Sequence, residues 1–478
     1  MNRLSWATLA LALAFAGCSG SSSRRSTSTA APVSSNSTGT PGSQTGGTTT
    51  PQTPHDPGGQ VAALGSASPA VLATLTRGAF VAFRELASTG GMELPAHPAL
   101  AGQAFVVQDN GYVRVLALDP TPRSLREVPL PGAPFSPGIA AGAIDLSQPE
   151  AAYVTASGAG GEAVYRFDPR SAASAADVTT YPLDGMTVTW PAGTLDQAGT
   201  DVGGQALPLT YTSDALGFGA TLFVTSANFD AQFNLNPGTL WAFQQDLQSG
   251  TLGAAQVLQT RGFNPTGIQR LETSAGPLLL ITDTGPYAGG MGAIDIVDPQ
   301  TFRTVGWIDL PGEDPVGRVE LSPNGRWGYV GSQSEAQVFA LDLSGLEALV
   351  GAQAPRNLGN RFRGGYALPT SPGGTNLISD VAVSHSGNTL YACNFNTSEL
   401  YVIDLVQPGL AATVTGFARS GDPQAYEGQL NGIALRPGEP GLDFQGPSLF
   451  TLTINLAAQD RTVTDVNVVL DAVSFDRQ

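Results

Sequence analysis

A repeated pair of short strands constrains the fold of this chain more than any other feature of its sequence. The clearest copy runs from Leu321 to Leu343. It begins with Ser322-Pro323-Asn324-Gly325, in which proline presets φ and the Asn-Gly pair tolerates a left-handed residue. The apolar runs that follow, 327–330 and 338–341, do not alternate with polar residues, which is typical of strands buried on both faces. This copy therefore predicts a hairpin that is covered on both sides.

Degenerate copies of this unit recur from about residue 100 to the C-terminus. An apolar residue anchors the second strand of each copy, and seven such anchors can be placed: Phe105, Tyr153, Phe223, Leu280, Tyr329, Tyr391 and Phe450. The smallest and largest separations are 48 residues, from Phe105 to Tyr153, and 70 residues, from Tyr153 to Phe223. Each interval has room for four strands. Six copies have a third strand that ends in aspartate: Asp119, Asp168, Asp246, Asp298, Asp342 and Asp404.

Four-stranded units repeated seven times predict an all-β fold, a seven-bladed β-propeller of four-stranded antiparallel blades. A single compact core of some 400 residues would be unusual, because cores stop growing at roughly 250–300 residues, and radial repetition removes that objection. The last unit lacks the third strand that ends in aspartate, so we expect a strand within Gly78–Leu86 to close the ring. The extra segment Asp184–Leu209 is expected to be a surface excursion.

The N-terminus predicts export. A short basic start is followed by an apolar run from Leu4 to Ala16, which is too short to span a membrane and fits a secretory signal. Ala16-Gly17-Cys18 resembles the bacterial lipobox, which implies a signal peptide over 1–17, lipidation at Cys18 and an extracytoplasmic protein anchored to the cell envelope. By the same resemblance, Ser19 implies the outer membrane if the host has one. An ordinary signal peptide with a chance cysteine is the alternative.

Composition divides the remainder of the chain. Residues 18–65 are rich in Ser, Thr, Gly and Pro and cannot bury a core, so they predict a flexible tether before a propeller domain at 66–478. A formal net charge of −17 disfavours nucleic acid or an anionic lipid surface as the main partner. Of the two cysteines, Cys18 lies in the targeting region, so no internal disulfide framework is expected in the mature domain.

Two repeats carry a resemblance to a known family. Ser322-Pro323-Asn324-Gly325-Arg326 before Tyr329-Val330-Gly331-Ser332, and Ser384–Asn388 before Tyr391–Asn394, resemble the YVTN-type repeats of bacterial seven-bladed propellers, a group that includes lactonase-like propellers. The match is good over the fifth and sixth units and loose elsewhere. The resemblance implies the propeller fold and admits a lactonase-like activity.

Candidate site residues follow from where propellers bind ligands. By analogy, ligands contact loops that enter the innermost strand of each blade and loops that leave its second strand. In this chain, those loops offer a polar funnel of Asn264, Asp283, Asp314, Arg318, Asp380, Asn394 and Asn431. In a functional funnel, Arg318 would pair with carboxylates, and Asp314 close to Asp380 would raise the pKa of one of them toward that of a usable base. The alternative is that these groups cap strand ends.

No other set of residues predicts a reaction. The repeat aspartates are interpreted as turn residues, since three precede proline, and no motif indicates a metal or another cofactor; calcium lacks a motif as well. His385 is interpreted as a turn residue, His97 has no partner in the sequence, and Cys393 is expected to be a buried core residue. The nearest glutamates, Glu320 and Glu399, are interpreted as strand or loop-edge residues.

Two functions remain open. The first is a monomeric binding or scaffold module on the cell envelope, whose partner is an envelope protein or a glycan. The second is a lactonase-like hydrolase acting on sugar lactones at the central funnel, which depends on the family resemblance alone. The sequence leaves open whether the protein is an enzyme.

Overall fold

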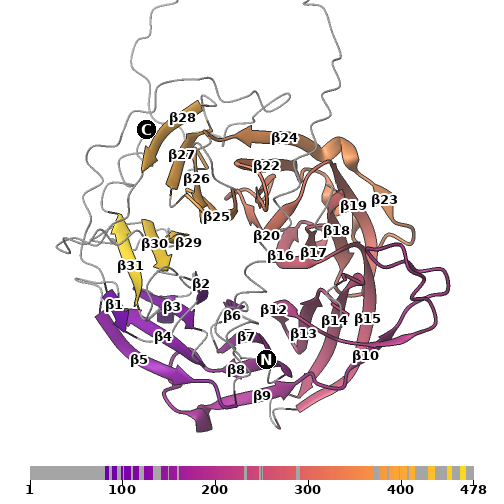
Figure 1. The fold of residues 1–478 in the computed structure, drawn as a ribbon, viewed down its shortest axis with the longest axis horizontal. Coiled ribbons are helices and arrows are strands. Elements are labelled where there is room, and N and C mark those ends of the chain that lie inside the picture. Colours follow the sequence, from indigo (N-terminus) through magenta and orange to yellow (C-terminus); the bar gives the residue numbers. More distant parts are fainter. Residues whose placement is uncertain are drawn as a thin grey trace, which may run out of the picture.

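The computed structural model describes most of residues 89–414, with short gaps between elements, and in addition the strands at 81–84, 429–435, 449–454 and 463–469. These residues form an all-β ring of antiparallel sheets around a central axis, a β-propeller (Figure 1). The short helices are 3-10 turns: η1 (Pro98–Leu100), η2 (Ala175–Asp177), η3 (Leu346–Leu349) and η4 (Gly359–Arg361). In the described part of the chain, no helix is long and apolar enough to cross a membrane.

The first four sheets follow one another along the chain, and each is an antiparallel meander numbered here from its innermost strand outward. Sheet 1 contains β2 (Thr89–Glu93), β3 (Gln103–Gln108), β4 (Tyr112–Ala117) and β5 (Arg123–Pro129); sheet 2 contains β6 (Ala141–Gln148), β7 (Ala151–Gly158), β8 (Gly161–Phe167) and β9 (Val178–Pro182). Sheet 3 contains β12 (Thr212–Phe218), β13 (Thr221–Ser226), β14 (Pro237–Asp246) and β15 (Thr251–Phe263); sheet 4 contains β16 (Pro265–Thr273), β17 (Gly276–Asp283), β18 (Met291–Asp298) and β19 (Arg303–Pro311), with β23 (Arg356–Asn357) added in parallel.

Three further sheets are described. Sheet 5 contains β20 (Pro315–Leu321), β21 (Trp327–Ser332), β22 (Gln337–Asp342) and β24 (Phe362–Ala367); sheet 6 contains β25 (Ile378–Val383), β26 (Thr389–Asn394), β27 (Glu399–Asp404) and β28 (Gly409–Val414). Sheet 7 contains β29 (Gln429–Leu435), β30 (Leu449–Ile454), β31 (Val463–Val469) and, from the other end of the chain, β1 (Val81–Arg84). β1 pairs with β31 in antiparallel register, so the expectation of a closing strand within Gly78–Leu86 is confirmed.

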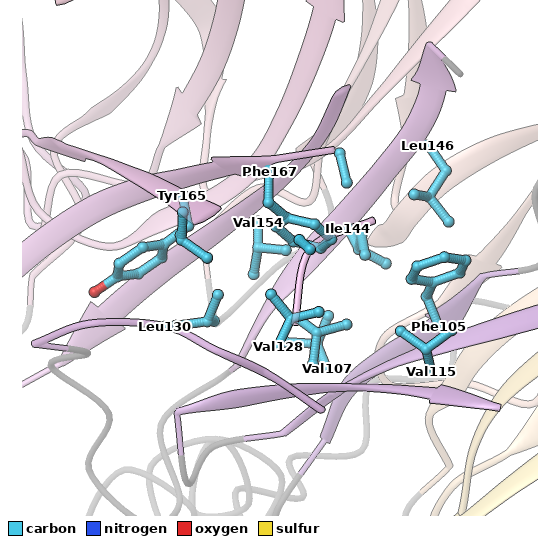
Figure 2. Close-up of a cluster of buried hydrophobic side chains, with 14 of the residues drawn as sticks. Phe105, Val107, Val115, Val128, Leu130, Ile144, Leu146, Val154, Tyr165 and Phe167 are labelled. Atoms are coloured by element: carbon cyan, nitrogen blue, oxygen red, sulfur yellow. The ribbon is translucent and has the colours of Figure 1, made fainter. Parts of the chain in front are cut away.

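The core lies between neighbouring sheets. Figure 2 shows the cluster between sheets 1 and 2, where Phe105 and Val107 of β3 pack with Val154 of β7 and Phe167 of β8. Similar clusters occupy the next four interfaces around the ring, from sheets 2 and 3 to sheets 5 and 6. Because both faces of sheets 2 to 5 are covered in this way, their central strands are apolar without alternation. Each fully buried large side chain contributes roughly 1.5–3 kcal/mol.

The repeat predicted from the sequence matches the sheets. All seven anchors lie on second strands, namely β3, β7, β13, β17, β21, β26 and β30, and the first six side chains are buried. The Ser322–Gly325 turn joins β20 to β21; its Gly325 has φ +64° and donates its N–H to the Ser322 carbonyl at 2.8 Å. The predicted hairpin is confirmed.

Four of the six repeat aspartates close turns at the ends of third strands, as expected. Asp298 accepts hydrogen bonds from the N–H groups of Gln300 and Thr301, and Asp342 accepts one from the Ser344 N–H at 3.1 Å. Asp168 and Asp246 accept equivalent bonds from residues two or three positions later. Asp119 lies outside the described residues.

The insertion before sheet 3 is more than the expected surface excursion. It forms a two-stranded ribbon, β10 (Thr187–Thr189) and β11 (Ala206–Pro208), and much of it is exposed. Trp190 is nevertheless only 2% exposed, because it is part of the same cluster as Trp241 and Phe243 of sheet 3. The large indole therefore anchors the ribbon to the core between sheets 2 and 3.

Candidate functional site

The innermost strands share one backbone feature that determines which side chains meet. Each of the seven strands nearest the axis (Figure 1) has a register shift, a β-bulge or similar irregularity, which changes the direction in which the following side chains point. On each innermost strand, we compare the residue two positions before the one that pairs with the anchor. This residue is Asp214 on β12, Arg318 on β20 and Asp380 on β25. On β16 and β29 this position is glycine.

Arg318 forms a bidentate ion pair with Asp214, across the sheet that separates them. Its Nε donates to one carboxylate oxygen at 2.8 Å and its second terminal nitrogen to the other at 2.7 Å. The Asp214 side chain is fully buried, whereas that of Arg318 is 25% exposed. Two backbone N–H groups, of Ala215 and Ile268, also donate to Asp214. Such a fork-to-carboxylate geometry holds the guanidinium in one orientation.

Gly267 makes this long reach possible. A β-carbon at Gly267 would lie 2.4 Å from the Gly317 carbonyl oxygen and 2.6 Å from the Arg318 nitrogen, so β16 and β20 can approach this closely only because the residue is glycine. Gly267 occupies the position on β16 that is equivalent to Asp214 and Arg318. Because glycine has no side chain, β16 places no side chain between these two charged groups.

Asp380 on β25 is the third charged residue at the inner-strand position that Asp214 and Arg318 share. It is partly buried and accepts hydrogen bonds from two backbone N–H groups, of Val381 at 2.9 Å and of Ile433 at 2.9 Å. Burial raises the pKa of Asp380 to about 6, although these two hydrogen bonds and the positive charge of Arg318 lower it. A carboxyl group with this pKa can exchange a proton close to neutral pH.

Carboxylates of the inner strands also join consecutive sheets. Asp145 on β6 accepts from the Gly217 N–H on β12 at 2.7 Å, and Glu320 on β20 accepts from the Val383 N–H on β25 at 3.2 Å. Asp214 and Asp380 do the same through the N–H groups of Ile268 and Ile433, respectively. Asp145, Asp214, Glu320 and Asp380 are called the inter-sheet carboxylates below. Each one ties its own sheet to the next one around the ring.

The other predicted funnel residues have local partners. Asp314 accepts from the hydroxyls of Ser332, at 2.5 Å, and Ser334, both beside the end of β21. The carboxylate that pairs with Arg318 is that of Asp214, which is not one of the predicted funnel residues. The raised pKa of Asp380 is caused first by burial, and Asp314 is not among its causes. Asn264 is a buried corner residue with φ +54° between β15 and β16.

Asn394 is fully buried and caps its own turn. Its side-chain oxygen accepts from the N–H groups of Asn396 and Thr397, and its amide nitrogen donates to Asn376. Asp283 is also fully buried, in the interface between sheets 3 and 4. Asn431 belongs to β29, but its side chain lies outside the described residues, as do Cys18, His97 and His385.

The remaining reactive groups are held in the core. Cys393 is fully buried as expected, its thiol 3.2 Å from the Ser379 hydroxyl, and burial raises its thiol pKa well above the usual range. Glu399 accepts hydrogen bonds from the hydroxyls of Thr397 and Tyr401. Among the described side chains, no group of three or more His, Cys, Asp or Glu could hold a metal ion.

Sequence reasoning did not include Asp214, which is the partner of Arg318. The signal was present, because Ser213-Asp214-Ala215 has the same pattern as Ser379-Asp380-Val381 and occupies the same place before an anchor. The third unit, however, matches the repeat loosely, and its long insertion moves Asp214 away from the place at which an even spacing would put it.

No protein-family model matches the chain, and no curated protein matches it. Among solved structures, the β-propeller domain of Cps50 (Swd1) from Myceliophteria thermophila is similar, with a TM-score of 0.51 and 12% identity over 82% of this chain and 100% of that one. KlHsv2 with its loop 6CD replaced by a Gly-Ser linker matches with a TM-score of 0.41 and 10% identity, over 79% of this chain and 96% of that one. At such low identity, the likeness to the Cps50 domain shows the fold alone: this chain is a β-propeller.

Proposed function

We propose that this protein is a binding or scaffold module of the cell envelope, whose partner is an envelope protein or a glycan. The proposal is supported by the inter-sheet carboxylates, each of which accepts a hydrogen bond from a backbone N–H of the next sheet. Hydrogen bonds of this kind stabilise a stiff inner frame. A stiff frame presents its loops, and the partly exposed Arg318, in fixed positions, which reduces the entropy lost on binding.

We further propose that the ring has seven blades and that its repeats are of the YVTN type. Seven sheets of four or five strands support the count in the described residues. So do the contacts between innermost strands, which run from β2 through β6, β12, β16, β20 and β25 to β29 and return to β2. The repeat type is supported by the turns of sheets 5 and 6, in which Gly325 and Gly387 have positive φ after the same Ser-x-x-Gly pattern.

Export and lipid anchoring at Cys18 are part of the proposal, and they depend on the sequence of the first 18 residues. Replacing Cys18 by serine should release the protein from the membrane fraction or leave it unprocessed, because serine lacks the thiol that would carry the lipid. Fractionation of cells that produce either protein, followed by detection of the chain in each fraction, checks this expectation. If the serine variant stays in the membrane fraction as the parent does, the anchor is not at Cys18.

A second candidate function is a lactonase-like hydrolase, favoured by one observation. The pKa of Asp380 is raised to about 6, so its carboxylate could accept a proton near neutral pH. Both of its oxygens, however, already accept backbone N–H groups, which fits a structural role better.

One experiment distinguishes the two functions. The purified protein is tested for binding on a glycan array and to separated envelope proteins, and for hydrolysis of sugar and acyl lactones by pH-stat. We expect binding without turnover. Arg318→Lys should weaken binding about tenfold, or 1.4 kcal/mol, because lysine cannot reproduce the bidentate geometry. Arg326→Lys, on the exposed β20–β21 turn, is the matched control and should leave binding unchanged.

Hydrolysis would reverse the assignment. Turnover that is present in the parent protein and lost in Asp380→Asn, with the fold retained by circular dichroism, would make Asp380 the base of an enzyme. If the Arg318→Lys protein binds as strongly as the parent, the contact surface lies away from the inner ring.

A further inference from the structure

Two buried carboxyl groups in sheet 4 have no role in the proposed function. Asp283 ends β17 and is 0% exposed, and Asp295 on β18 is 1% exposed. In the register, Asp283 is opposite Ala293 and Asp295 is opposite Ile281, so the two aspartates are diagonal neighbours on one face of the sheet. That face packs against sheet 3, because Ile281 belongs to the cluster between the two sheets.

These two carboxyls hold the segment that joins sheet 3 to sheet 4. The end of β15 crosses over them, and two consecutive backbone N–H groups donate to them: that of Arg261 to Asp295 Oδ2 at 2.9 Å, and that of Gly262 to Asp283 Oδ2 at 3.3 Å. A β-carbon at Gly262 would lie 2.7 Å from the Asp283 β-carbon, so the crossing is close. The next strand, β16, begins at Pro265, which makes this crossing the connection between the two sheets.

Each carboxyl has one oxygen without a partner. Oδ1 of Asp283 and Oδ1 of Asp295 are both buried and accept no hydrogen bond. Two ionised carboxylates in this arrangement would repel each other and leave two charged oxygens without hydrogen bonds, which is costly in a protein interior. A proton on one Oδ1 would remove one charge and supply a donor for the other oxygen.

The charged groups around the pair do not cancel this cost. Arg261 of β15 lowers both pKa values, but its guanidinium is stacked over Trp307 at 3.9 Å and is 3.7 Å from Asp309. Asp309 on β19 raises the pKa of Asp295. Burial is the largest cause for both: it raises the pKa of Asp295 to about 7 and that of Asp283 well above its usual value, and for Asp283 the negative charge of Asp295 is the second cause.

We propose that Asp283 and Asp295 share one proton in the folded protein, and that this proton completes a clamp on Arg261 and Gly262 that holds sheets 3 and 4 together. The clamp is pH-sensitive. Because a folded-state pKa above the unfolded value of about 3.9 means that the folded protein binds the extra proton, stability falls as the pH rises from about 4 through about 7.

The test is thermal unfolding of the full-length protein and of Asp295→Asn between pH 5 and pH 9. An asparagine at 295 can accept from the Arg261 N–H and donate to Asp283 without titrating. We expect the fall in Tm between pH 5 and pH 8 to be smaller in this variant by about 4 °C, and its Tm at pH 8 to exceed that of the parent. Glu272→Gln removes a carboxylate of the same sheet whose side chain is 62% exposed and which does not act on either aspartate, so it should keep the pH dependence of the parent.

Infrared spectroscopy detects the shared proton directly. In infrared difference spectra at pH 6, the parent should show the C=O stretch of a protonated buried carboxyl that is absent from Asp295→Asn. Parallel pH profiles for the two proteins, with no such band, would overturn the proposal. So would a rise in the Tm of the parent, but not of the variant, on adding Na⁺ or Ca²⁺ at pH 8 without the infrared band, because the pair would then hold a cation in place of the proton.

Discussion

Replacing Asp214 by alanine is expected to lower the free energy of unfolding by about 3–5 kcal/mol, because the change breaks a buried ion pair and leaves its partner without a counter-charge. Asp214 is fully buried and receives four hydrogen bonds, two from Arg318 and one each from the N–H groups of Ala215 and Ile268. Alanine would leave both N–H groups without this acceptor and would remove one tie between sheets 3 and 4. Urea unfolding followed by tryptophan fluorescence measures the loss.

The matched control is Glu150→Ala. Glu150 also faces an arginine, Arg170, but at 3.9 Å and with a side chain that is 71% exposed. Solvent weakens such a pair, so the change should cost less than about 0.5 kcal/mol. Equal and small losses for the two variants would show that Asp214 does not tie the inner strands together.

The fold could be predicted because its signals are local. A Ser-Pro-Asn-Gly turn, an apolar second strand and a third strand that ends in aspartate each lie within about 20 residues of one another in the copy from Leu321 to Leu343. Each of these signals reflects the backbone geometry of a few consecutive residues, and the structure places Tyr329 and Asp342 where the repeat predicts them.

The partners of the site residues could not be predicted in the same way. Arg318 and Asp214 are 104 residues apart, and their contact depends on two bulges and on Gly267 in the sheet between them. The Asp283 and Asp295 carboxyls meet only because of the register between β17 and β18 and the path of β15 over them. Turn and periodicity signals carry no information on such long-range geometry. The sequence therefore indicated Arg318 and Asp380 as polar residues of the inner ring without indicating what they bind.

Removing the closing strand is expected to be the most damaging change to the ring. Val81–Arg84 forms β1, whose four residues pair with Val463–Val466 of β31. A chain that begins at residue 86 lacks β1, so the outer edge of β31 would be left with unpaired N–H and C=O groups. We expect its Tm to fall by on the order of 5–10 °C and the protein to aggregate, as measured by differential scanning calorimetry and light scattering.

A chain that begins at residue 66 is the control, because it lacks only the segment that the composition predicts to be a tether. It keeps β1 and should unfold at the Tm of the full-length protein. The comparison separates two explanations for any effect of shortening the N-terminus. If both shortened chains lose stability equally, residues before 66 contribute to the fold and the predicted tether is wrong. If neither loses stability, sheet 7 holds without β1, and the ring is closed by the contact between β29 and β2 rather than by pairing the two ends of the chain.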